Sequence, residues 1–239
     1  MNKFVCRLVM VFMVCLSPFL IAGCESTDEI NDGGEWGYES KNLVTGYVFP
    51  EEMSVSIGVL DSSRIVFEVR TQGLVVGRHL KGAWGEFRDL TEEDVAERAR
   101  LFDSMSVVFG DTAYNQLVSM RENWALAYPI DSIAIVSDVD YDVNHPAGSN
   151  LFDLVIIETY SYGEKVINKN PSRYFILEKK VSELTPEDRT LMTSKFGDML
   201  YNTGRYTIPQ TSHPQICQLT VTYFFSNGLN LSASAQVKL

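Results

Sequence analysis

Short runs of apolar residues, most of them alternating with polar ones, recur along the chain from Asn42 onward. A period of two is typical of strands that bury one face. The pattern predicts strands over residues 43–49, 54–60, 64–70, 74–80, 132–137, 151–160, 174–178, 216–225 and 229–239. The last two flank Ser226-Asn227-Gly228, and Asn-Gly between alternating runs is the strongest short-range signal for a hairpin.

Helical patterns occur in three places. The sequence Thr-Glu-Glu-Asp beginning at Thr91 matches a capping box with acids in the first turn, which predicts a helix to about residue 102. A second helix is predicted from Asp111 to about residue 122. The third begins at Thr185, because an N-cap threonine precedes a proline and two acids, and Asn202-Thr203-Gly204 is expected to end it.

Many short strands with few helices predict an α+β, strand-rich fold. We expect an antiparallel sheet or sandwich with two or three helices at one side or end and a C-terminal β-hairpin. Strands and helices do not alternate regularly, so a doubly wound parallel sheet is disfavoured. The length predicts a single globular domain over residues 42–239, and a subdivision near residues 122–130 stays open.

The N-terminus has a different pattern, in which Lys3 and Arg7 precede an apolar run over residues 8–22. These parts define a signal peptide over residues 1–23, and the run is shorter than the roughly 20 residues that span a bilayer. The run ends in Ile21-Ala22-Gly23-Cys24, which resembles the bacterial lipobox. The resemblance implies that Cys24 becomes the mature N-terminus and carries acyl chains such as palmitate, which anchor the protein in a membrane. The alternative is an ordinary cleaved signal beside a stray cysteine.

Residues 24–41 are rich in acids and glycine, which predicts a flexible acidic tether. The acids after Cys24 resemble the surface-export signals of Bacteroidota lipoproteins. The alternative is a soluble tether with no role in export. Residues 136–153, with alternating aspartates followed by His145-Pro146-Ala147-Gly148-Ser149 and Asp153, resemble a family of Bacteroidota lipoproteins of unknown function. That resemblance implies an outer-membrane location, on the surface or the periplasmic face, and adds no activity.

The composition limits the kinds of partner that the protein could bind. The 239 residues include 20 basic and 31 acidic ones, and the loss of Lys3 and Arg7 with the signal leaves 18 basic residues and a net charge of −13. Nucleic-acid binding is disfavoured, because it requires a basic face. Two of the four cysteines leave with the signal and Cys24 would be acylated, so no intramolecular disulfide is expected. Cys217, in a strand-like run, is expected in the core.

Two sets of residues are candidate ligands of a cation. Asp138, Asp140 and Asp142 alternate as at the start of a calcium loop, but positions 6 and 12 are valine and serine, which excludes an EF-hand. A looser Ca²⁺ site and a solvated loop both stay open. The histidines His79, His145 and His213 would bind zinc only if the fold brought them together with Asp140 or Asp142.

Catalytic motifs for acyl transfer, dinucleotide binding and phosphate binding do not occur in the sequence. A glycosidase needs only two suitably spaced carboxylates, so an enzyme stays possible but is not favoured. Trp84 and Trp124 are candidates for stacking on sugars or partner proteins. We therefore expect a non-catalytic binding or assembly lipoprotein of the cell envelope. The alternative is a fimbrial or adhesin subunit that uses strand addition at its C-terminal hairpin, and a glycan-acting hydrolase comes third.

Overall fold

The computed structural model describes residues 37–61, 64–77, 89–119, 124–161, 175–192, 202–211 and 215–238. The strands are β1 (Gly37–Ser40), β2 (Gly46–Asp61), β3 (Arg64–Gly77), β4 (Gln116–Ser119), β5 (Trp124–Leu126), β6 (Ile130–Ser137), β7 (Ile156–Ser161), β8 (Phe175–Lys180), β9 (Asn202–Pro209), β10 (Ile216–Phe225) and β11 (Asn230–Lys238). The helices are α2 (Glu92–Val108), α4 (Pro186–Leu191) and the short 3-10 helix η3 (Val181–Glu183). The strand-rich α+β class is confirmed.

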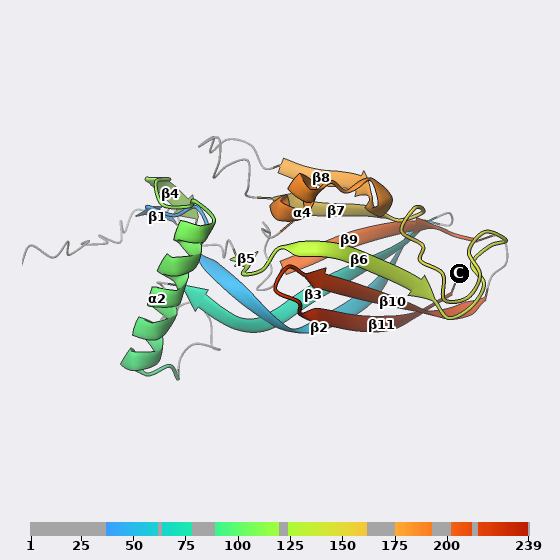
Figure 1. The fold of residues 1–239 in the computed structure, drawn as a ribbon, viewed down its shortest axis with the longest axis horizontal. Coiled ribbons are helices and arrows are strands. Elements are labelled where there is room, and N and C mark those ends of the chain that lie inside the picture. The colour runs from blue at the N-terminus through green and yellow to red at the C-terminus, as the bar shows by residue number, and fades with distance from the viewer. Residues whose placement is uncertain are drawn as a thin grey trace, which may run out of the picture.

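The strands form three sheets (Figure 1). A six-stranded sheet has the order β5-β2-β3-β9-β7-β8, a three-stranded sheet the order β11-β10-β6, and β1 pairs with β4. All pairs are antiparallel except β2 with β5, which run parallel over Gly46–Val48. The six-stranded sheet is therefore mixed, whereas an antiparallel sheet or sandwich was predicted. Figure 1 shows α2 crossing one end of the molecule beside β1 and β4, with the C-terminus toward the other end.

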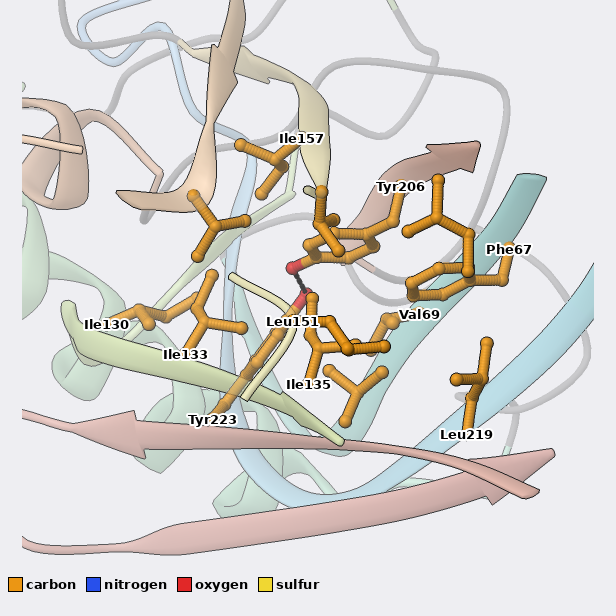
Figure 2. Packing of buried hydrophobic residues seen from close by; sticks show 14 of the residues in the cluster. Phe67, Val69, Ile130, Ile133, Ile135, Leu151, Ile157, Tyr206, Leu219 and Tyr223 are labelled. Carbon is orange, nitrogen blue, oxygen red and sulfur yellow. Dashed lines mark hydrogen bonds between the residues drawn. The ribbon is translucent and has the colours of Figure 1, made fainter. Parts of the chain in front are cut away.

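The inner faces of the two larger sheets share one apolar core (Figure 2). Strands of the six-stranded sheet contribute Phe67, Val69, Ile157 and Tyr206, and β6 and β10 contribute Ile130, Ile133, Ile135, Leu219 and Tyr223. The rings of Phe67 and Tyr206 stack with centroids 5.1 Å apart. The buried hydroxyls of Tyr206 and Tyr223 are 2.5 Å apart and satisfy each other by a hydrogen bond across the core.

This tyrosine pair explains why one sequence prediction is wrong. Asn202-Thr203-Gly204 was expected to end a helix, but these residues begin β9, which pairs with β3 and β7. A Cβ atom at Gly204 would lie 2.8 Å from the Tyr223 hydroxyl and 3.0 Å from the Tyr206 ring. The glycine is needed there for the close approach of two aromatic side chains, and not for a helix cap.

The two strands predicted over residues 43–49 and 54–60 are a single long strand, β2. Its partner β3 likewise joins the predicted run 64–70 to residues 74–77 of the predicted run 74–80, and residues 78–80 lie outside the described residues. The pairing of β2 with β3 is irregular between Pro50 and Glu52. A Cβ atom at Gly73, which pairs with Pro50, would lie only 2.0 Å from the Phe49 carbonyl oxygen, so glycine permits the irregularity.

The helix predictions have mixed outcomes. The start of α2 is confirmed, since the Thr91 side chain accepts from the Asp94 N–H and the Asp94 carboxylate accepts from the Thr91 N–H. The helix continues to Val108, beyond the expected end near residue 102. The start of α4 at Pro186 is also as predicted, and residues 193–200 lie outside the described part of the chain.

The helix predicted from Asp111 to residue 122 is wrong over the residues described there. Residues 116–119 form β4, which pairs with β1, and Asn115 has a positive φ of 49° that a helix does not allow. The partner strand β1 lies in Gly37–Ser40, which was assigned to the tether. A single sequence window could not reveal this pairing, because the two strands are separated by β2, β3 and α2.

The other strand predictions agree in place and differ in length. Residues 132–137 belong to β6 and residues 175–178 to β8, while the strand predicted over 151–160 begins only at Ile156. Instead, the buried Leu151 begins a turn, in which its carbonyl accepts from the Leu154 N–H. Strands β10 and β11 pair over nine positions around the Asn-Gly turn. Within the described residues, no helix is both long and apolar enough to cross a membrane.

Candidate functional site

The loop between β6 and β7, residues 138–155, holds the candidate cation ligands. It lies at the end of the molecule opposite α2 (Figure 1). The loop is bound to its surroundings by main-chain hydrogen bonds, including those from the Gly148 N–H to the Ser137 carbonyl and from the Leu151 N–H to the Ile135 carbonyl. The main chain of the loop is therefore held in a defined position beside β6.

The three alternating aspartates each bind a different part of the protein. Asp138 accepts from the Gln218 N–H at 2.7 Å, and Asp140 accepts from the Ala147 N–H at 2.8 Å. Asp142 accepts from the Asn144 and His145 N–H groups at 2.8 and 3.0 Å. Their carboxylates act as acceptors that shape the loop. In the described ranges, no three His, Cys, Asp or Glu side chains gather as a metal site would require.

His145 lies between two carboxylates. Its Nδ1 is 2.7 Å from Asp142 Oδ1 and its Nε2 is 3.1 Å from Asp153 Oδ1, and 12% of its side chain is exposed. The hydrogen bond with Asp142 raises the pKa of His145, and the bond with Asp153 adds to this. The same contact with His145 lowers the pKa of Asp142. Because both ring nitrogens are occupied, this Asp-His-Asp cluster fastens the loop, and His145 has no nitrogen turned toward a substrate.

The other residues singled out from the sequence either lie in the core or fall outside the residues that the structure describes. Trp124 is 3% exposed and packs against Val48 and Val75, so the prediction that it offers a stacking surface is wrong. Cys217 is 2% exposed and lies in the main core as predicted, and burial raises the pKa of its thiol. Cys24, His79, Trp84 and His213 lie outside the described residues.

Sequence reasoning missed a buried carboxylate, Asp111, at the α2 end. Its two oxygens accept from the Leu43 and Val44 N–H groups, each at 2.8 Å, and its own carbonyl accepts from the Asn42 side chain. Asp111 is 2% exposed, and this burial raises the pKa of its carboxyl against the effect of the two N–H groups. Asp111 thus joins the end of α2 to the segment that precedes β2.

The outward face of the three-stranded sheet was also missed. Opposite side chains on β10 and β11 form three polar pairs: Gln218 with Gln236, Thr220 with Ser234, and Thr222 with Ser232. The two hydroxyl pairs are hydrogen bonded at 2.7 and 2.8 Å. We call these six residues the hydroxyl–amide face; four of them are exposed and both threonines are half-buried. The feature of the sequence that could have revealed this face is its lack of charge, since the two strands contain one charged residue, Lys238.

Comparison of the chain with protein-family models, with curated proteins and with solved structures finds no match.

Proposed function

We propose that the protein is an outer-membrane lipoprotein, anchored through Cys24, whose domain binds an uncharged, hydroxyl-rich ligand such as a neutral glycan at the hydroxyl–amide face. The anchor is supported by the basic N-terminus, the apolar run and the sequence Ile21-Ala22-Gly23-Cys24. The observation that carries the binding role is the face itself. It is a regular uncharged array on a protein whose formal net charge is −11.

The chemistry of the face favours a neutral partner. Hydroxyl and side-chain amide groups both donate and accept hydrogen bonds, as sugar hydroxyls do. The loss of hydration on binding also costs less free energy for an uncharged surface than for a carboxylate-rich surface. An anionic partner would instead meet repulsion from the many acids elsewhere on the protein.

The anchor is tested by membrane fractionation and by protease treatment of intact cells. Cys24→Ala should release the protein from membranes, and a variant that still fractionates with them would contradict the anchor. If the native protein is cleaved on intact cells while a periplasmic marker survives, the face is presented to the medium. A protein that is cut only after the outer membrane is broken would have a role inside the periplasm.

The binding role is tested by a panel of neutral and acidic polysaccharides with the purified lipidated protein in detergent. The double variant Ser232→Glu/Ser234→Glu should weaken binding of a neutral polysaccharide about tenfold or more, which corresponds to about 1.4 kcal/mol. Ser182→Glu is the matched control, since this serine is exposed and lies away from the face in η3. Equal binding by both variants, or preference for acidic polysaccharides, would overturn this role.

A fimbrial or adhesin role remains the second candidate, because β11 is the edge strand of its sheet. An incoming strand could pair with such an edge. However, β11 also lies against β2 of the same molecule, which limits access to that edge. Subunit polymers in native membranes would support strand addition, and a monomer at all concentrations would exclude it. Removal of residues 229–239 is a poor test, because Val237 belongs to the core and Leu231 packs against it.

A hydrolase requires two neighbouring carboxyl groups, one of them with a raised pKa. Among the described carboxyl groups, a raised pKa is found at Asp111. Both of its oxygens accept main-chain hydrogen bonds, so its observed role is structural. The enzyme hypothesis therefore ranks third, and activity against glycans by the purified protein would raise it.

A further inference from the structure

The last turns of α2 expose apolar side chains. Val107 is 69% exposed, Val108 is 71% exposed and Leu101 is 37% exposed. The helix itself is attached along a narrow face, since only Phe102 and Ser106 among its residues are buried. Leu101 and Val108 are seven residues apart and so lie on the same side of the helix. Val107 and Val108 are adjacent in the sequence and, with Leu101, form a small apolar surface on the last turns of the helix.

This apolar turn lies close to the point where the chain enters the domain. The Asp111 carboxylate binds the Leu43 and Val44 N–H groups, and the Tyr114 N–H donates to the Lys41 carbonyl at 2.9 Å. The described chain begins a few residues earlier, with β1 at Gly37. Figure 1 shows β1, β4 and α2 together at one end of the molecule. The described part of the chain therefore begins at the α2 end.

The length of that segment limits how far this end can be from the proposed lipid. Cys24 and Gly37 are 13 positions apart in the sequence. A chain of this length reaches at most about 45 Å when fully extended, and an average of about 20 Å as a random coil. An anchor at Cys24 would thus keep the α2 end within about 45 Å of the bilayer.

Charge determines which part of α2 could touch lipid. The acids Glu92, Glu93, Asp94 and Glu97 lie in the first two turns, whereas Asp103 is the single charged residue between Leu101 and Val108. Removal of the first turns from water would be costly because they are charged. The last two turns could enter the interface between headgroups and acyl chains at little cost, as apolar side chains do in interfacial helices.

We propose that Val107 and Val108, together with Leu101, rest on the lipid bilayer to which the protein is anchored. The inference depends on the proposed anchor at Cys24, which brings this surface to the membrane. The three contacting side chains are uncharged and apolar, so the contact takes uncharged lipid. It orients the domain with α2 toward the membrane and the loop of residues 138–155 toward the surrounding medium.

The test uses the lipidated protein in vesicles of phosphatidylcholine and phosphatidylethanolamine. Val108→Cys carries an environment-sensitive fluorophore, and Ser234→Cys on the hydroxyl–amide face is the matched control. The one other thiol outside the signal and the anchor, Cys217, is buried. Lipids with brominated acyl chains should quench the label at 108 several-fold more than the label at 234. Addition of Val107→Asp to the labelled Val108→Cys protein should remove this difference.

The outcomes separate the contact from the anchor. Vesicle flotation and the mass of the N-terminal cysteine report the anchor directly. If the protein floats but the labels at 108 and 234 are quenched equally, the bilayer contact is wrong while the anchor stands. If the protein neither floats nor carries lipid, both proposals fall. In solution without vesicles, the label at 108 could become shielded from water as the protein concentration rises. This result would assign the surface to self-association and overturn the inference.

Discussion

Asp111 and Asp142 lie at opposite ends of the molecule and make almost the same contacts. Each carboxylate accepts two main-chain N–H groups, Asp111 at 2.8 and 2.8 Å and Asp142 at 2.8 and 3.0 Å. Their surroundings differ. Asp111 is 2% exposed and has no cation among the causes of its pKa shift, whereas Asp142 is exposed and faces His145.

The pKa of each carboxyl reflects this difference. Burial raises the pKa of Asp111, although its two hydrogen bonds oppose the shift. The hydrogen bond with His145 lowers the pKa of Asp142. Two main-chain hydrogen bonds to a carboxylate can thus accompany a pKa shift in either direction, because the dielectric surroundings and the nearest charge decide the sign. At the α2 end the carboxylate is buried as a fixed acceptor, and at the loop end it is part of a titratable cluster.

The largest effect should come from removal of the buried acceptor. Asp111→Ala leaves the Leu43 and Val44 N–H groups buried without partners, at a cost of about 2–4 kcal/mol in the free energy of unfolding. Asp111→Asn retains one acceptor oxygen of the same shape and should cost about half as much. Urea unfolding followed by circular dichroism measures both variants. An Asp111→Ala protein as stable as the native one would mean that these hydrogen bonds are replaced by water.

An intermediate effect should appear in the dependence of stability on pH. The raised pKa of Asp111 means that its ionised form is disfavoured in the folded state, so stability rises as pH falls through that pKa. Asp142 has the opposite sign: its contribution is present above the unfolded value of about 3.9 and is lost as pH falls through its lowered pKa. Asp111→Asn should remove the first dependence and Asp142→Asn the second, as measured by thermal unfolding between about pH 3 and 8.

His145 adds a dependence on the alkaline side of this range. Its pKa is raised, so its contribution is complete below the unfolded value of about 6.5 and is lost as pH rises through the folded pKa. The native melting temperature should therefore fall between slightly acidic and slightly alkaline pH, and His145→Gln should make it level there. A fall that persists in the variant would assign the titration to another group.

The smallest effect is expected from the outer half of the cluster. Asp153→Asn weakens a half-exposed contact to His145, and exposed ion pairs contribute less than about 1 kcal/mol. Asp131→Asn, an exposed aspartate on β6, is the matched control. The difference in melting temperature between the two variants measures the contact, and it should vanish at high salt. A large difference that resists salt would show that Asp153 acts by shaping the loop.

The sequence alone predicted the local features that depend on adjacent residues. The capping box at Thr91, the proline at the start of α4 and the Asn-Gly turn between β10 and β11 are all present. Each works through hydrogen bonds or backbone angles within about four residues, so the necessary information lies in one short window. The burial of Cys217 follows in the same way from the alternation of its strand.

Features that depend on distant partners were not predictable. Gly204 reads as a helix stop until Tyr206 and Tyr223 meet beside it. Asp111 reads as a helix start until the Leu43 and Val44 N–H groups reach its carboxylate. Trp124 reads as a stacking surface until β5 pairs with β2 and buries it. In each case the same residue type suits two environments, and only the tertiary contact selects between them.

The sequence by itself therefore determined the strand-rich α+β class, the ends of its capped helices and the C-terminal turn, because these are set by periodicity and by neighbouring residues. The tertiary structure decided which acids are buried, which are exposed and which face is free of charge. Alternation shows that one side of β10 and β11 faces outward, but the register places hydroxyl opposite hydroxyl. Register and burial arise from contacts between residues far apart in the chain, and a linear pattern does not contain them.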